Sequence, residues 1–120
     1  MGTIQEDRLG TVRISDEVII ICATNATLKV EGVKELSTSI ADNISKNILG
    51  KEPASKGIKL SRSEEGLTLD ISVIVNYMVK IPQLAWEIQS KVKQEIEEMT
   101  ALKVLAVNIH VQGVAGEEQK

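Results

Sequence analysis

The sequence is poor in several residue types that mark particular classes of protein. Its 120 residues include no Phe, one Trp, one Tyr, two Pro, one His and one Cys. Because Cys22 is the sole cysteine, the chain can form neither an internal disulfide nor a cysteine-based zinc site. Metal sites usually need several His, Cys or carboxylate ligands, which His110 cannot supply alone. We therefore expect no metal and no other cofactor.

Neither sign of charge dominates, and no long apolar run is present. The net charge is -3 from 14 basic and 17 acidic residues, whereas nucleic-acid binding favours clustered Lys and Arg. No apolar run approaches the ~18 residues of a membrane span. The opening "MGTIQEDRLG" lacks the apolar segment of a secretory signal. We expect a cytoplasmic protein that neither binds nucleic acid nor inserts directly into the membrane.

Length and composition fit one domain. A chain of 120 residues with 42% hydrophobic residues can bury a core without a disulfide or a metal. We expect a flexible N-terminal tail over residues 1–8, a single domain over 9–114 and a disordered C-terminal tail over 115–120.

Two long helices are predicted. Ser15 is a good N-cap and Gly32 a good C′ residue for a helix between them. Pro82 opens the second helix. Its predicted apolar stripe is Leu84, Ala85, Ile88, Val92, Ile96 and Met99. A shorter helix is predicted over residues 39–50, with Ile40, Ile44 and Ile48 on one face.

Strands are predicted around these helices, at residues 10–14, 33–36 and 101–114 and in a hairpin over 57–77 that turns at 64–66. The second hairpin strand places Leu67, Leu69, Ile71, Val73, Val75 and Tyr77 on one face, and the last strand turns Leu105, Val107, Ile109 and Val111 inward. The order predicts an α+β fold: a two-layer sandwich whose mainly antiparallel sheet, of about four to five strands, carries two long helices packed on one face.

Candidate catalysts are few. Asp70 and His110 lie on polar strand faces, where solvated side chains are common, so we predict no catalytic and no cofactor-binding residue. There is no Walker A loop and no G-x-G-x-x-G motif. Residues 113–116, "GVAG", have the form of a KH loop but follow the final strand. A KH-like single-stranded nucleic-acid-binding module is therefore the alternative interpretation, and a small hydrolase that uses Asp70 or a helix carboxylate is a third.

Four apolar residues lie outside the predicted core stripes. Ile20, Ile21 and Leu28 fall off the main stripe of the first helix, and Trp86 lies about 200° from Leu84 on a helical wheel. A helix that is apolar on more than one face is deeply buried or contacts a partner. We predict an interaction surface made of Ile20, Ile21, Leu28 and Trp86.

Four stretches, in this order and spacing, resemble the alkaline shock protein family, the envelope stress response proteins of Gram-positive bacteria. They are "KVEGVKEL" at residues 29–36, "SKGIKL" at 55–60, "LTLDISVIVNYMVKIPQLAWEIQSKVKQEIEEMTAL" at 67–102 and "VLAVNIHVQGV" at 104–114. The resemblance covers residues 9–114.

The resemblance implies a non-enzymatic, self-associating cytosolic protein that supports cell-envelope homeostasis. It also implies recruitment to the membrane periphery by a small membrane-embedded anchor protein. The family has no established catalytic residues to carry over. One departure concerns the turn after Tyr77, where the family usually has Gly and this chain has Met78. A positive φ at that position would be awkward for Met.

Overall fold

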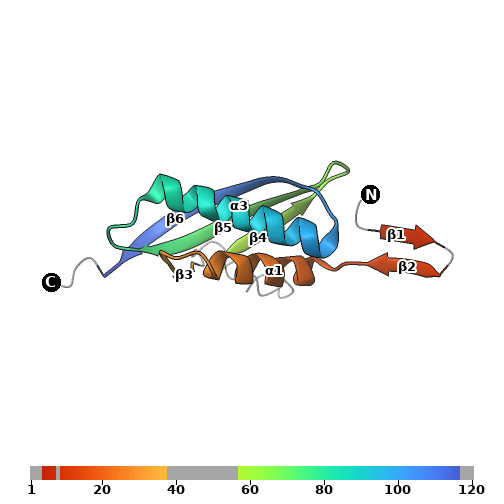
Figure 1. The fold of residues 1–120 in the computed structure, drawn as a ribbon, viewed down its shortest axis with the longest axis horizontal. Coiled ribbons are helices and arrows are strands. Elements are labelled where there is room, and N and C mark those ends of the chain that lie inside the picture. The colour runs from red at the N-terminus through yellow and green to blue at the C-terminus, as the bar shows by residue number, and fades with distance from the viewer. Residues whose placement is uncertain (1–3, 8, 38–56, 117–120) are drawn as a thin grey trace, which may run out of the picture.

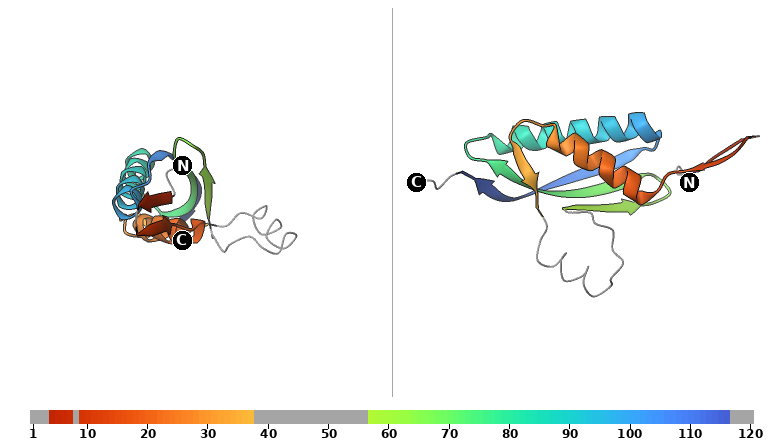
Figure 2. Two further views of the ribbon diagram at one scale, coloured as in Figure 1. Left: turned by 90° about the vertical axis from the view of Figure 1, so that its right-hand side faces the viewer. Right: turned by 90° about the horizontal axis from the view of Figure 1, so that it is seen from below.

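The structure is a computed structural model that describes residues 4–7, 9–37 and 57–116. Within these ranges the chain is an α+β sandwich, as predicted, with two long helices on one face of a twisted sheet (Figure 2). The predicted helix over 39–50 and the segment that follows it, up to residue 56, lie outside the described residues. So do residues 1–3 and 117–120 of the two predicted tails.

Helix α1 spans Asp16–Leu28 and begins where the sequence predicts. The Ser15 hydroxyl accepts a hydrogen bond from the Val18 N–H at 3.3 Å, which satisfies one donor of the first turn. The helix ends at Leu28, so the prediction that Gly32 is its C′ residue was wrong. Gly32, at φ 108°, lies instead in the turn that leads into strand β3.

Helix α3 spans Ile81–Thr100, with a proline in its first turn, as predicted. Its buried residues are Leu84, Ile88, Val92, Ile96 and Thr100, each four residues after the last. Such a row inclines across the helix, because four residues exceed one 3.6-residue turn. The row therefore reaches Thr100, and the prediction that Met99 faces the core was wrong.

Strand β5, Leu67–Asn76, is the centre of the sheet (Figure 1). Strands β3 (Val33–Leu36) and β4 (Ile58–Arg62) both pair antiparallel with it. Strand β4 pairs with the first half of β5 and β3 with the second half. Strand β6 (Val104–Ala115) pairs with β5 in parallel, because α3 carries the chain back before β6 begins. Two of the three pairings are antiparallel, in line with the predicted sheet.

A separate hairpin precedes α1. Strands β1 (Ile4–Asp7) and β2 (Gly10–Arg13) pair antiparallel beyond one end of the sandwich (Figure 1). Residues 4–7 therefore form a strand, where the sequence led us to expect part of a flexible tail. The limits of the single domain, 9–114, stay a prediction.

The core fills the space between the helices and the sheet. Burying each large aliphatic side chain contributes roughly 1.5–3 kcal/mol. The alternation predicted for β5 is confirmed from Leu67 to Val75, all of whose odd-numbered residues are buried. Tyr77 differs and is exposed, because the strand ends at Asn76 and the chain turns towards α3.

Strand β6 departs from simple alternation at its start. Val104 is buried and Leu105 is exposed, the reverse of the prediction for Leu105. The pairing with β5 shifts register between Leu67 and Thr68. Such a bulge adds one residue to one strand and reverses the faces of its side chains. Beyond the bulge, Val107 is buried, and Ile109 and Val111 pack against the core, as predicted.

Candidate interaction surfaces

Helix α1 divides the predicted interaction residues between its two sides. Ile20 is only 8% exposed and belongs to the core, so its assignment to an exposed surface was wrong. The reason is that α1 packs against α3, β3 and β4 together and thus buries a wide arc. Ile21 is 55% exposed and Leu28 is also exposed; they are seven residues apart and share the outward side.

A groove of about 350 Å³ separates the outer sides of α1 and α3. Its apolar lining includes Val18 and Ile21 from α1 and Met99 from α3, all of them exposed. Lys29 and Glu95, also on its lining, form an ion pair at 3.1 Å that joins the two helices. Cys22 lies at the bottom of this groove, and burial raises the pKa of its thiol, which keeps it protonated and unreactive.

The other flank of α3 faces strand β6. The Gln89 amide donates to the Val107 carbonyl at 3.0 Å, and the Lys93 ammonium donates to the Val104 carbonyl at 3.2 Å. Trp86 lies three residues before Gln89 and seven before Lys93, a spacing that puts all three on one side of the helix. Its indole is 63% exposed, so the predicted surface residue is accessible on this flank.

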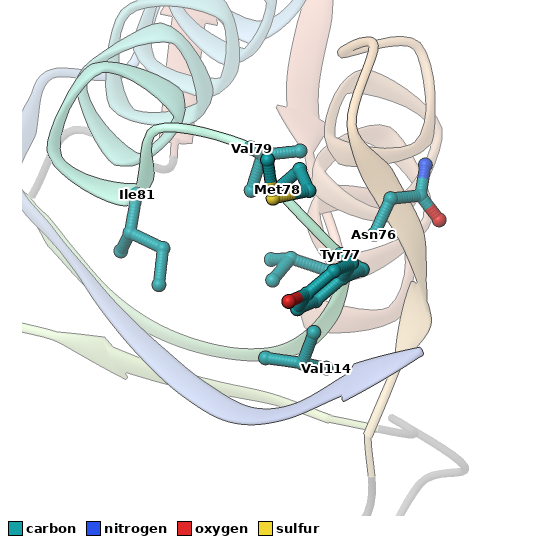
Figure 3. A pocket seen from close by; sticks show the side chains of 7 residues that line it. Asn76, Tyr77, Met78, Val79, Ile81 and Val114 are labelled. Carbon is teal, nitrogen blue, oxygen red and sulfur yellow. The ribbon is translucent and has the colours of Figure 1, made fainter. Parts of the chain in front are cut away.

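A third apolar surface lies at the end of the sheet, in the turn between β5 and α3. Tyr77, Met78, Val79, Ile81 and Val114 surround a pocket of about 310 Å³ (Figure 3). Met78 is 80% exposed. Its φ is 78°, so Met occupies the left-handed conformation in which the sequence comparison led us to expect Gly.

Sequence reasoning missed this end pocket. Tyr77 continues the alternation of β5 and was therefore placed inside, although the strand stops one residue earlier. The signal that could have found the pocket is the run of apolar residues from Tyr77 to Val79 just before Pro82. A turn that is this apolar is unusual, because connecting segments run over the surface.

The polar side chains of the outer sheet face come together around Asp70. Its carboxylate accepts a hydrogen bond from the Asn108 amide at 3.2 Å and lies 3.1 Å from His110 Nε2. His110 and Asp70 are both substantially exposed. Within the described part of the chain, His110 makes no hydrogen bond to a hydroxyl or thiol, as a nucleophile activated by it would need.

Other kinds of site receive little support from the described residues. Across residues 4–7, 9–37 and 57–116, no group of three His, Cys, Asp or Glu side chains could hold a metal ion. No described helix is both long and apolar enough to cross a bilayer. The "GVAG" segment is the end of β6 and the residue after it, whereas a KH loop lies between two helices.

The comparison with known protein families agrees with the resemblance seen in the sequence. A profile of the alkaline shock protein family, described as having a "cell envelope-related function", matches residues 4–116. The chain belongs to this family. Relatives include YqhY of Bacillus subtilis, an uncharacterized protein 33% identical over 110 residues, with 92% of this chain and 81% of the relative aligned. Spy1535 of Streptococcus pyogenes, also uncharacterized, is 38% identical over 92% of this chain and 83% of its own length.

A more distant member of the family carries a functional name. A "stress response regulator gls24 homolog" of Streptococcus pyogenes is 24% identical over 92% of this chain, which covers 62% of that protein. Among solved structures, a MamM CTD variant matches with a TM-score of 0.51 at 12% identity, over 82% of this chain and 98% of that one. At that identity the likeness concerns the fold alone.

Proposed function

We propose that this protein is a non-enzymatic, self-associating cytoplasmic protein that supports the cell envelope. One observation carries the proposal: large apolar side chains are exposed on the helical layer. They include Val18, Ile21, Leu28, Trp86 and Met99. Exposed apolar clusters on a folded domain mark contact sites. Membership of a family with a cell envelope-related function supports the cellular role.

Recruitment to the membrane by a small membrane-embedded anchor protein is part of this proposal. The mixed charge of the chain supports indirect recruitment, since direct binding to anionic lipid needs clustered Lys and Arg. Flotation with vesicles of phosphatidylglycerol and phosphatidylethanolamine tests this step. We expect the protein to stay unbound. Flotation with bare vesicles would contradict recruitment through a partner.

Self-association is tested by sedimentation equilibrium of the purified protein over a hundredfold range of concentration. We expect the average molar mass to rise with concentration. Trp86→Ala and Ile21→Ser then ask which flank of the helical layer takes part. Asn25→Ser is the control, because Asn25 is exposed one turn after Ile21 and is already polar. A parent protein that stays monomeric throughout would overturn the proposed function.

A further inference from the structure

Strand β6 is an edge strand that lacks the charged residues and prolines that usually protect such an edge, although its pairing with β5 is irregular near both ends. It is twelve residues long, "VLAVNIHVQGVA", and contains no Lys, Arg, Asp, Glu or Pro. In the described part of the chain it pairs with β5 alone. Edge strands of soluble proteins are normally short, charged or interrupted by proline, because an open edge invites another strand.

The first half of this edge is occupied by side chains of α3. Lys93 and Gln89 donate to the Val104 and Val107 carbonyls, and the Val104 N–H donates to Glu97 at 2.9 Å. These three contacts occupy three of the backbone groups that point away from β5 near the start of the strand. They leave no obvious room for a second strand there.

The second half of the edge has no such cover from α3. Since the Val107 carbonyl points towards α3, alternation directs the N–H and C=O groups of Ile109 and Val111 to the same open side. The residues of β6 from Val107 to Val111 pair with β5 in regular register, so this alternation holds through the segment. Backbone donors and acceptors at positions 109 and 111 are thus arranged for strand pairing.

Trp86 lies next to this open half. Helix α3 and strand β6 run in opposite directions. Lys93 contacts Val104, and Gln89, one turn earlier in α3, contacts Val107, which is further along β6. Trp86 is three residues further back, a step of about 4.5 Å along the helix. That step corresponds to one or two residues of strand at about 3.3 Å each. From this step we infer that the exposed indole lies beside Asn108 and Ile109.

We propose that residues 108–111 of β6 pair antiparallel with the same segment of a second copy, across a two-fold axis flanked by the two Trp86 side chains. This inference rests on the proposed self-association and identifies its surface. The chemistry of the segment favours a second copy as the occupant. Like charges directly opposite each other destabilise a strand pair, and an uncharged segment paired with itself has none to oppose. A two-fold axis uses the same patch on both copies, and Trp is enriched at the centre of such contacts.

A charge-swap experiment at residue 110 tests the pairing. The His110 side chain is half exposed on the outer face, at the middle of the segment. Residues 109–111 of one copy can pair with residues 109–111 of the other in more than one register. In each of these registers, residue 110 of one copy lies directly or diagonally opposite residue 110 of the other. His110→Lys and His110→Glu should each weaken self-association at least threefold. An equimolar mixture of the two should associate more tightly than either variant alone.

Two matched controls accompany this test. Ser61→Lys and Ser61→Glu place the same charges at an exposed position of strand β4, at the opposite edge, and should associate like the parent. Trp86→Ala should weaken association about tenfold. Gln94→Ala, which shortens an exposed polar side chain elsewhere on α3, should not. Thermal unfolding of every variant confirms that the fold is intact.

The outcomes separate this inference from the proposed function. If the parent associates while the His110 and Trp86 variants associate equally well, the β6 edge is not the contact and only this inference is overturned. Weakening by Ile21→Ser alone would move the contact to α1 and overturn it in the same way. A parent that is monomeric at every concentration would overturn the proposed function, and this inference with it.

Discussion

The two edges of the sheet are built differently. One edge consists of β3 and β4, two short strands that carry Lys34, Glu35, Lys59 and Arg62. Arg62 is tied to the helical layer, since its guanidinium pairs with the Asp16 carboxylate and donates to the Ile14 carbonyl at 2.8 Å. The other edge is a single long strand, β6, without a charged residue. Charge protects the first edge, whereas the second depends on side chains from α3 and is protected over only half of its length.

The comparison shows how one sheet can restrict pairing with another strand to one part of one edge. A charged, interrupted edge disfavours pairing along its whole length. On β6 the backbone groups are covered by the side chains of Gln89, Lys93 and Glu97, so each part of the cover can be removed by a single substitution. Each part of this difference can be tested by substitution, from the largest expected effect to the smallest.

The first prediction concerns the junction of the interrupted edge. Gly57 has a φ of 84°, and a Cβ built on it would lie 2.7 Å from the Ser37 carbonyl oxygen and 3.0 Å from that of Ser72. Gly57→Ala should therefore lower the free energy of unfolding by about 2–3 kcal/mol, through left-handed strain and disturbed pairing between the strands. Urea denaturation measures the loss.

Gly116, beyond the end of β6, provides the matched control. Its φ of 83° is nearly the same, but a Cβ there would meet nothing within 4 Å. Gly116→Ala should cost about 1 kcal/mol or less, from strain alone. Equal losses for the two variants would show that the β3–β4 junction is not closely packed.

The second prediction concerns the protected half of β6. The hydrogen bond from the Val104 N–H, together with the Lys93 ammonium at 2.9 Å, lowers the pKa of Glu97. A lowered pKa means that the ionised carboxylate stabilises the fold at neutral pH. That contribution is lost as the pH falls from the ordinary carboxyl range through the lowered value. Because the group is partly exposed, Glu97→Gln should cost only about 1 kcal/mol at pH 7.

This difference between parent and variant should shrink as the solution is acidified, which urea denaturation at several pH values would show. Glu98→Gln is the control, because Glu98 is exposed and, among the described residues, its carboxylate accepts only from the Gln94 amide at 3.3 Å. It should leave the free energy of unfolding nearly unchanged. A loss for Glu97→Gln that stays constant with pH would contradict the role of the ionised carboxylate.

The third prediction concerns the turn beside the far end of β6. Met78→Gly should raise the free energy of unfolding by about 0.5 kcal/mol, because relief of left-handed strain exceeds the added entropy of the unfolded chain. Ala101→Gly is a matched change, since Ala101 has a φ of 64° at the end of α3. A gain at Ala101 with a loss at Met78 would mean that the Met78 side chain packs usefully in the end pocket. Thermal and urea unfolding of both variants distinguish these results.

Regular periodicity made much of the fold predictable. The alternation from Leu67 to Val75 and the apolar row of α3 each express one repeat over many residues, and both lie in the core as expected. The Ser15 cap is similarly local, since it depends on atoms three residues apart. Of the four residues predicted to form an interaction surface, Ile21, Leu28 and Trp86 are exposed.

Errors occurred where a neighbour in space changes the pattern. Ile20 lies outside the narrow stripe of α1, yet it is buried because three other elements pack around that helix. Leu105 faces outward because β6 carries a bulge against β5, and a shift of one residue reverses every side chain. Neither the wide burial of α1 nor the bulge leaves a mark in the local sequence.

The sequence by itself determined the two long helices, the hairpin strands, the α+β class and the family, because these follow from local repeats, caps and motif order. The tertiary structure alone decided that β6 runs parallel to β5 at an open edge. It also decided that α3 side chains occupy the start of that edge, and that Trp86 is exposed on the same flank of α3. The physical reason is that strand pairing and edge exposure depend on which distant segments meet. The sequence of an uncharged strand does not show whether another segment covers its edge in the folded protein.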